Sequence, residues 1–246
     1  MMGSEIKRAP RSEEKKYEGV VAFDLDGTLL RGIRHSWSLL WKAVGCSREE
    51  AIKCQKAFVA GEIDYKQWVR HDFESLRDNG LTLDKINDAI KATGCSLTKN
   101  MKPAIKMLKD NGYVTAVISG GVDAVLKHFI PDPEKYFDEL FINRLVWDDQ
   151  NNLIDIIATD YDWDPGKKGV LGKCGGLKEI CRKYKVPLEK SVFVGNDEND
   201  FMAMRVAGRK VYFSAQGIET AKTVEGVKIE QKNDLLAVAE YIIGKN

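Results

Sequence analysis

Residues that could do chemistry together follow three short apolar runs of the sequence. They are Asp24 with Asp26, Ser119 with Gly120, and the polar stretch 195–200. Apolar runs that are rich in β-branched residues and stop at polar ones are typical of buried strands. In open α/β sheets, ligands bind beyond the carboxyl ends of the strands. We therefore expect these polar residues to meet at one edge of a sheet.

The residue types suit chemistry on a phosphate ester. A carboxylate such as that of Asp24 is repelled by a phosphate dianion, so the site must supply positive charge. Lys173 is one source of this charge. Mg²⁺ is another, because it prefers oxygen ligands from one or two carboxylates, waters and a substrate phosphate. A lone lysine or a single polar loop is more often a solvated surface feature, so it is the combination that indicates a site.

The segments that must position these residues alternate between helix and strand patterns. The expected strands are 20–23, 113–118, 191–194 and 211–213. Residues 139–159 form two further short strand patterns around Asp149–Asn152, which indicates a hairpin. Strands that alternate with helices favour a parallel sheet with helices on both faces, so the expected fold class is α/β.

A run of helix patterns interrupts this alternation between residues 34 and 94. Apolar residues recur there at the spacing of an amphipathic helix, as in Trp37, Leu40, Trp41 and Val44. Capping and glycine signals separate four such patterns, and no strand pattern lies among them. We therefore expect a small helical bundle inserted after the first strand.

The composition restricts the class of protein. The chain of 246 residues has 38 Lys and Arg against 37 Asp and Glu, and its net charge of +1 argues against nucleic-acid binding driven by charge. No stretch approaches the roughly 18 apolar residues of a membrane span, and the N-terminal segment has no apolar signal-peptide centre. We expect a cytoplasmic protein without a membrane partner. The five cysteines form no Cys-x-x-Cys pair, which favours reduced thiols.

The motif Asp24-Leu25-Asp26-Gly27-Thr28 resembles the signature of the haloacid dehalogenase superfamily, whose phosphatases carry D-x-D-G-T at the end of the first strand. Three later features resemble the second, third and fourth motifs of that superfamily in order and spacing. They are Ile118-Ser119-Gly120, Lys173 and the stretch 195–200. The resemblance covers nearly the whole chain after its N-terminal segment.

Within the superfamily, the sequence is most similar to the phosphoserine phosphatase group. The helical segment lies between the first and second motifs, Asn143 opens a similar hairpin, and Lys173 lies 23 residues before Asn196. The resemblance implies a Rossmann-like parallel-sheet core with a small α-helical cap domain inserted after the first strand. The expected divisions are a flexible arm at 1–17, the catalytic core at 18–32 and 96–246, and the cap at 33–95.

The resemblance also implies a phosphoric monoester hydrolase that uses Mg²⁺ and an aspartyl-phosphate intermediate. Asp24 would be both nucleophile and metal ligand. Asp26 would be the general acid and base, with its main-chain carbonyl on the metal. Lys173 would counter the charge of the nucleophile and of the transferring group. The groups expected to bind the phosphate are those of Gly27, Thr28, Ser119 and Gly120.

The fourth motif departs from the pattern of the group at its first acid. Asn196 stands where phosphoserine phosphatases carry an aspartate on the metal, and an amide oxygen brings no negative charge. We expect weaker metal binding unless Asp197 or Asp200 compensates. We favour Asp200 as the second carboxylate ligand, with Asn196 as a ligand through its amide oxygen or a water. Asn199 is expected to contact the substrate.

The positions that hold the substrate differ as well. Phosphoserine phosphatases carry an acidic residue shortly after the first motif, where this chain has Arg31-Gly32-Ile33-Arg34. The cap arginine expected to hold the serine carboxylate aligns with Asp72, although Arg70 is near. Phosphoserine is therefore disfavoured, and we expect another small phosphorylated metabolite. Arg31 and Arg34 would favour a second anionic group on it.

Two other functions stay open. An aspartyl-phosphate can pass to an alcohol as well as to water, so a phosphotransferase or mutase of the same superfamily is one alternative. A degenerate site would leave a non-catalytic metabolite-binding protein. A dehalogenase is disfavoured, because a halide leaves without a proton and an acid at Asp26 would have little purpose. Neither the substrate nor the oligomeric state follows from the sequence.

Overall fold

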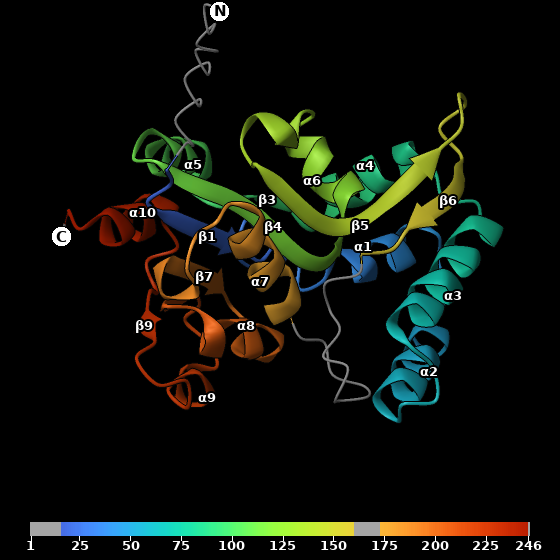
Figure 1. Ribbon diagram of the computed structural model, residues 1–246. Helices are drawn as coiled ribbons and strands as arrows, with labels where there is room; N and C mark the ends of the chain where they lie inside the picture. The colour runs from blue at the N-terminus through green and yellow to red at the C-terminus, as the bar shows by residue number, and fades with distance from the viewer. Residues whose placement is uncertain (1–15, 160–172, 246) are drawn as a thin grey trace, which may run out of the picture.

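The computed structural model describes residues 16–159 and 173–245, so the predicted arm at 1–17 lies almost wholly outside the described residues. Within these ranges, seven strands form one sheet (Figure 1). In sheet order they are β6 (Leu153–Ile157), β5 (Glu139–Trp147), β4 (Tyr113–Val122), β1 (Gly19–Phe23), β7 (Ser191–Gly195), β8 (Arg209–Tyr212) and β9 (Lys228–Ile229). Neighbouring strands are parallel except β5 and β6, which form the predicted hairpin. The predicted α/β class is confirmed.

The central strand β1 is apolar along its whole length because both of its faces are covered. All five of its residues are buried. Val21 and Phe23 belong to one hydrophobic cluster, whereas Val20 and Ala22 belong to another. Successive side chains of a strand point to opposite faces, so the two clusters lie on the two sides of the sheet.

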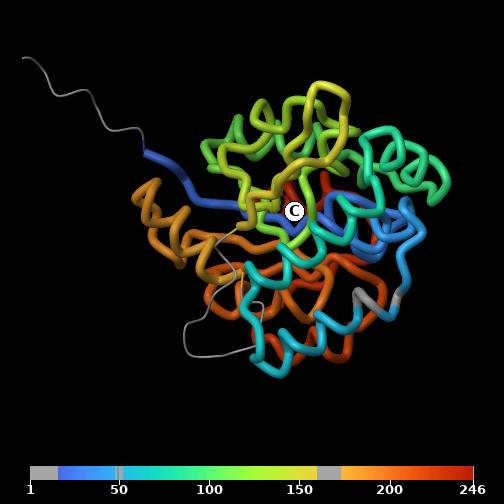
Figure 2. The backbone as a smooth tube through the Cα atoms, turned by 90° about the vertical axis from the view of Figure 1, so that its right-hand side faces the viewer, coloured from blue at the N-terminus to red at the C-terminus, as the bar shows by residue number. Residues whose placement is uncertain are grey.

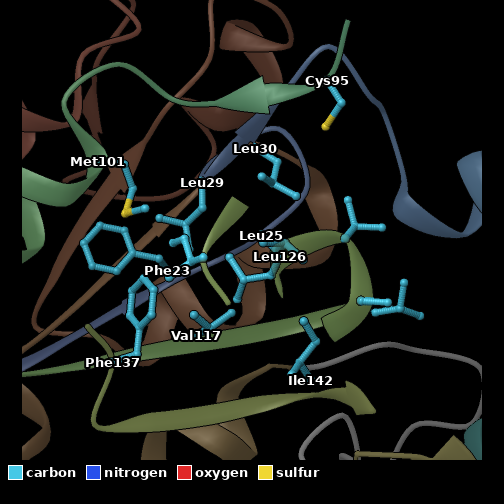
Figure 3. Packing of buried hydrophobic residues seen from close by; sticks show 14 of the residues in the cluster. Phe23, Leu25, Leu29, Leu30, Cys95, Met101, Val117, Leu126, Phe137 and Ile142 are labelled. Carbon is cyan, nitrogen blue, oxygen red and sulfur yellow. The ribbon is translucent and has the colours of Figure 1, made fainter. Parts of the chain in front are cut away.

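Helices cover each face of the sheet. The first cluster contains residues of α5 (Met101–Asp110), α6 (Asp123–Phe129) and α10 (Leu235–Ile243), and Figure 3 shows its packing around Phe23 and Leu25. The second cluster contains residues of α7 (Cys174–Lys183), α8 (Phe201–Val206) and α9 (Ile218–Ala221). None of the helices in the described ranges has the length and apolar content that a membrane crossing requires.

A helical cap is inserted after the first strand, as predicted. Its helices are α1 (Ser36–Ala43), α2 (Arg48–Val59), α3 (Tyr65–Asp78) and α4 (Leu83–Thr93). A short antiparallel ribbon, β2 (Leu30–Arg31) with β3 (Ser96–Leu97), brackets them. The cap contacts the core where α3 packs against β6 and where α4 packs against α6. Figure 2 views the molecule from the side of the cap. The divisions at residues 33 and 95 stay a prediction.

Local signals fix where the cap helices begin and end. The Asp64 side chain accepts a hydrogen bond from the backbone N–H of Gln67, and the Gln67 side chain accepts one from the backbone N–H of Asp64, both at 2.8 Å. This capping box starts α3. Gly94 ends α4 with φ +66°, a left-handed conformation that favours glycine.

One predicted turn is a strand. The sequence predicts a polar turn at Ser119–Gly121, whereas β4 continues to Val122, with an irregular pairing to β5 between Ile118 and Val122. The amide of Asn143 in β5 donates to the carbonyls of Gly120 (2.9 Å) and Gly121 (3.0 Å). Because a side chain satisfies these carbonyls, the segment stays extended without a regular ladder.

Candidate active site

The carboxyl ends of β1, β4 and β7 lie side by side, because β1 stands between the other two strands. Asp24 directly follows β1, and its backbone N–H donates to the carbonyl of Val194 in β7 at 2.9 Å. Ser119 lies near the end of β4, and Asn196 directly follows β7. The sheet therefore brings the first, second and fourth motifs to one edge.

Lys173 joins the first and fourth motifs through its ammonium group. Its Nζ donates to Oδ1 of Asp24 at 2.5 Å and to Oδ1 of Asp200 at 2.7 Å. All three residues are buried, with exposed fractions of 2% for Lys173, 4% for Asp24 and 0% for Asp200. Two buried carboxylates thus share one ammonium.

Burial and charge act on these groups in opposite directions. Burial raises the pKa of Asp24, and it raises the pKa of Asp200 to about 6, because the Lys173 ammonium offsets the loss of water only in part. Burial lowers the pKa of Lys173, but the charges of Asp200 and Asp24 outweigh it and raise this pKa above its ordinary value. Lys173 therefore stays protonated at neutral pH, and further positive charge would stabilise the two carboxylates.

Asp200 uses both carboxylate oxygens within the protein. Oδ1 accepts from Lys173, and Oδ2 accepts from the backbone N–H groups of Asn196 (2.8 Å) and Asp197 (3.1 Å). The carboxylate packs on Gly195, where an added Cβ would lie 2.3 Å from Oδ2. These contacts favour a role for Asp200 in positioning Lys173 and the loop after β7, over the metal-ligand role that the sequence predicts.

One carboxylate oxygen of Asp26 is hydrogen-bonded, and the other has no partner among the described residues. Its Oδ2 accepts from the backbone N–H (2.7 Å) and the hydroxyl (2.8 Å) of Ser36, at the first turn of α1. Its Oδ1 is buried and has no hydrogen-bond partner among the described residues. Burial raises the pKa of Asp26, and the two Ser36 hydrogen bonds oppose this rise. Sequence reasoning misses Ser36, whose only signal is its place at a helix start.

The hydroxyl of Ser119 lies beside the Asp26 carboxylate. A Cβ added to Gly121 would lie 3.1 Å from Oδ2 of Asp26 and 3.3 Å from Oγ of Ser119, so both groups flank this glycine. The backbone N–H of Gly121 donates to Oγ of Ser119 at 3.1 Å. The carbonyl of Gly120 accepts from the indole N–H of Trp37 at 2.8 Å. The cap thus contacts the second motif directly.

Thr28 and Asn196 connect the first motif to the fourth on the other side. The Thr28 hydroxyl donates to Oδ1 of Asn196 at 2.8 Å. Gly27 has φ +81°, and an added Cβ would lie 2.4 Å from the Asn196 amide nitrogen, so both the backbone conformation and the close approach require glycine. In the same loop, Oδ1 of Asn199 is buried without a hydrogen-bond partner in the described part of the chain.

The oxygen groups at this edge fit a magnesium ion, although the set is weak in charge. No three His, Cys, Asp or Glu side chains within residues 16–159 and 173–245 are grouped as a metal site. The sequence predicts the Asp24 and Asp200 carboxylates, the Asn196 amide oxygen and the main-chain carbonyl of Asp26 as ligands, and Asp200 already uses both of its oxygens within the protein. Mg²⁺ accepts such a set, because it takes few protein oxygens and completes its shell with waters and substrate phosphate.

The Arg31 side chain packs on Phe213. Its guanidinium lies over the ring of Phe213, 4.6 Å from the centroid, and its Nη2 donates to the carbonyl of Phe213 at 3.4 Å. Phe213 follows β8, whose neighbour in the sheet is β7. The structure thus gives Arg31 a stacking partner at the β8 end of the sheet, while its buried Nε has no hydrogen-bond partner among the described residues.

Residues 19–208 match the family described as haloacid dehalogenase-like hydrolase. The chain is 30% identical to the phosphoserine phosphatase of Methanocaldococcus jannaschii, over 93% of this chain and 99% of that protein. It is 26% identical to the phosphoserine phosphatase of Lactococcus lactis, over 92% of this chain and 95% of that protein. A solved structure described as a phospho-aspartyl intermediate analogue of phosphoserine phosphatase has a TM-score of 0.64 and 29% identity, and covers 92% of this chain and 99% of its own. The chain therefore belongs to the haloacid dehalogenase-like hydrolase family, in its phosphoserine phosphatase-like group, and is a phosphoric monoester hydrolase.

Proposed function

We propose that the chain is an Mg²⁺-dependent phosphatase that hydrolyses a small-molecule phosphate monoester through an aspartyl-phosphate on Asp24. The observation that carries this proposal is the buried contact of Asp24 with the Lys173 ammonium, which Asp200 holds in place. A cation at hydrogen-bond distance from the nucleophile offsets the repulsion between a carboxylate and a phosphate dianion.

Asp24 and Asp26 divide the chemistry between them. In the first step, a carboxylate oxygen of Asp24 forms a bond to phosphorus while the ester P–O bond breaks, and Asp26 gives its proton to the departing alcohol oxygen. In the second step, Asp26 takes a proton from water, the water oxygen bonds to phosphorus, and the Asp24 carboxylate leaves. Ser36 binds Oδ2 of Asp26, so that the open Oδ1 is the oxygen that carries the proton.

Other residues bind and orient the phosphoryl group. The hydroxyl of Ser119 and the backbone N–H of Gly120 are donors for its oxygens, and the Thr28 hydroxyl becomes a third when it turns from Oδ1 of Asn196 to the phosphate. Gly27 lets the Asn196 amide pack against this loop, which brings the fourth motif up to these donors. Asn199, whose amide oxygen is buried and open, is the further polar group available to the substrate.

Asp24, Asn196 and the Asp26 carbonyl would hold the magnesium ion, which supplies positive charge to the phosphate when bound. Asp200 serves as a positioning residue, since its oxygens are occupied by Lys173 and by two backbone N–H groups.

Hydrolysis of p-nitrophenyl phosphate and 2-hydroxyethyl phosphate tests the proposal. We expect turnover with Mg²⁺, its loss with EDTA, and a loss on the order of 10⁴-fold or more in Asp24→Asn. Asp110→Asn, an exposed acid paired with Lys106, is the matched control and should keep full turnover. Turnover that survives Asp24→Asn, or none in the unchanged chain, would overturn the proposal. Transfer of phosphate to an added alcohol in place of its release would identify a phosphotransferase.

A further inference from the structure

The peptide group between Gly120 and Gly121 connects a side chain of the cap to the hydroxyl of the second motif. Its C=O, on Gly120, accepts from the indole N–H of Trp37 in α1 at 2.8 Å. Its N–H, on Gly121, donates to Oγ of Ser119 at 3.1 Å. The C=O and N–H of a trans peptide point in opposite directions. Trp37 and the Ser119 hydroxyl therefore lie at the two ends of one amide group.

Side chains orient this peptide, because no regular ladder does so. The pairing of β4 with β5 is irregular between Ile118 and Val122, and glycine backbones rotate more freely than others. The Gly120 carbonyl also accepts from the Asn143 amide at 2.9 Å, and the Tyr65 hydroxyl lies 3.5 Å from it. Trp37 makes the shortest of these three contacts. The orientation of the peptide therefore depends on the cap as well as on β5.

The first turn of α1 contacts the same segment at a second point. The hydroxyl of Ser36 accepts from the backbone N–H of Val122 at 3.2 Å and donates to Oδ2 of Asp26 at 2.8 Å. A Cβ added to Gly121 would lie 2.7 Å from Oγ of Ser36, so α1 packs directly on this glycine. Two successive residues of α1 thus contact β4 on both sides of Gly121, and they fix Trp37 relative to the second motif.

The hydrogen bond from Gly121 determines where the Ser119 proton points. A serine hydroxyl has one proton to donate and two lone pairs that accept. The Gly121 N–H occupies the oxygen as a donor, so the hydroxyl proton must point away from it. Among the described residues this hydroxyl donates to no other group, so its proton is available to a ligand. A donor on the Gly120 carbonyl also polarises the peptide and strengthens the Gly121 N–H.

We propose that Trp37 is a positioning residue, whose indole N–H orients the Gly120–Gly121 peptide so that the Ser119 hydroxyl donates its proton to the phosphoryl group. This inference rests on the proposed function, because it takes the phosphate to be bound by Ser119. Trp37 acts through the peptide and Ser119. Without its N–H, the peptide is free to turn, and the Ser119 hydroxyl loses the contact that directs its proton.

A double-mutant cycle between Trp37 and Ser119 tests the proposal through kcat/KM for p-nitrophenyl phosphate. Trp37→Phe should lower it by about 3- to 10-fold, which corresponds to one net hydrogen bond. Ser119→Ala should lower it by about 10²-fold. Because Trp37 acts through Ser119, adding Trp37→Phe to Ser119→Ala should lower it by less than about twofold further. The same loss in both backgrounds, or no loss in either, would overturn the proposal.

Trp41→Phe is the matched control, since Trp41 lies one turn later on α1 and is buried in the apolar cluster. It should keep kcat/KM within about twofold in both backgrounds. If Trp37→Phe fails to fold, 3-benzothienylalanine at position 37 takes its place, because this isostere has sulfur instead of the N–H and keeps the packing. The same losses are expected of it, and full activity with it would overturn the proposal.

Inhibition by orthovanadate, which adopts the five-coordinate geometry of the transferring phosphoryl group, is a second readout. Its inhibition constant should rise in Trp37→Phe by the same factor as kcat/KM falls. An unchanged inhibition constant would show that the indole N–H does not act on the phosphate donors, and would overturn the proposal. Failure of the proposed function is a separate result, in which the unchanged chain hydrolyses no ester or Asp24→Asn has no effect.

Discussion

Buried acids lie both at the edge of the sheet and on α3, but they differ in the hydrogen-bond partners that the protein gives them. At the sheet edge, Asp24 and Asp200 share the Lys173 ammonium, and Asp200 also accepts two backbone N–H groups. On α3, Asp72 and Trp68 each leave a buried polar atom without a partner in the described part of the chain. Asp24 and Asp200 thus have partners within the protein, whereas Oδ1 of Asp26 at the same edge and Oδ1 of Asp72 on α3 have none among the described residues.

The charged groups at the sheet edge are held by the core, where the ends of adjacent strands fix their partners. The polar groups on α3 belong to the cap. The sequence also treats the two regions differently, because the motifs at the sheet edge resemble those of the family at most positions, whereas Arg31 and Asp72 are expected to depart from its pattern.

Apart from the loss of the nucleophile in Asp24→Asn, the largest effect is expected at Asp26, an acid of the sheet edge whose Oδ1 has no hydrogen-bond partner among the described residues. Asp26→Asn should lower kcat for 2-hydroxyethyl phosphate by about 10²- to 10⁴-fold, because an alkoxide leaves poorly without a proton. The loss for p-nitrophenyl phosphate should be much smaller, since nitrophenolate leaves without one. Asp132→Asn, an exposed acid, is the control. Equal losses for the two esters would contradict the acid role.

Removal of the shared cation should destabilise the sheet edge. Lys173→Met leaves Asp24 and Asp200 buried without a counter-charge, which costs about 3–5 kcal/mol of unfolding free energy. Urea unfolding at pH 7 measures this loss, and Lys178→Met, an exposed lysine of α7, is the matched control. An unchanged urea midpoint would show that the two carboxylates do not depend on Lys173.

Removal of the acid on α3 should instead raise the unfolding free energy. Folding raises the pKa of Asp72 from its ordinary 3.8 to about 7, so between these pH values the folded chain holds a proton that the unfolded chain has released. Stability therefore falls as the pH rises through this range. Asp72→Asn should raise the unfolding free energy by about 2–4 kcal/mol at pH 8, and the gain should shrink as the pH is lowered toward 4. A gain that does not change with pH would refute the raised pKa of Asp72.

The smallest effect concerns the metal. Asn196→Asp adds a negative charge next to the magnesium position and should increase the affinity for Mg²⁺ by at least about tenfold, measured by titration calorimetry without substrate. Asp200→Asn should change this affinity less, because its oxygens already have protein partners. A larger loss of affinity in Asp200→Asn than the gain in Asn196→Asp would restore Asp200 as a ligand.

Short local signals predict the parts of the fold and site that depend on neighbouring residues. The apolar run before Asp24, the capping box at Asp64 and the glycine after α4 each determine structure within a few residues, so the strands and cap helices follow from the sequence. The meeting of Asp24 with Ser119 at one edge follows from the parallel order of the strands.

Such local signals do not predict contacts between segments that are distant in the sequence. The partner of Asp26 is Ser36, in the cap, and the partner of the Gly120 carbonyl is Trp37. Ser119–Gly121 has the composition of a turn, but Asn143 keeps it extended. The family's pattern predicts a departure at Asp72, but the burial of this acid is evident only from the folded cap.

Identification of the residue that carries the phosphoryl group tests the central claim most directly. The chain would be mixed with p-nitrophenyl phosphate and Mg²⁺, quenched in acid within a turnover, and reduced with borohydride, which converts an aspartyl-phosphate to homoserine. Peptide mass spectrometry should then find homoserine at position 24 and an unmodified aspartate at position 26. Hydrolysis with no modification at position 24, or with the modification at another residue, would contradict the account.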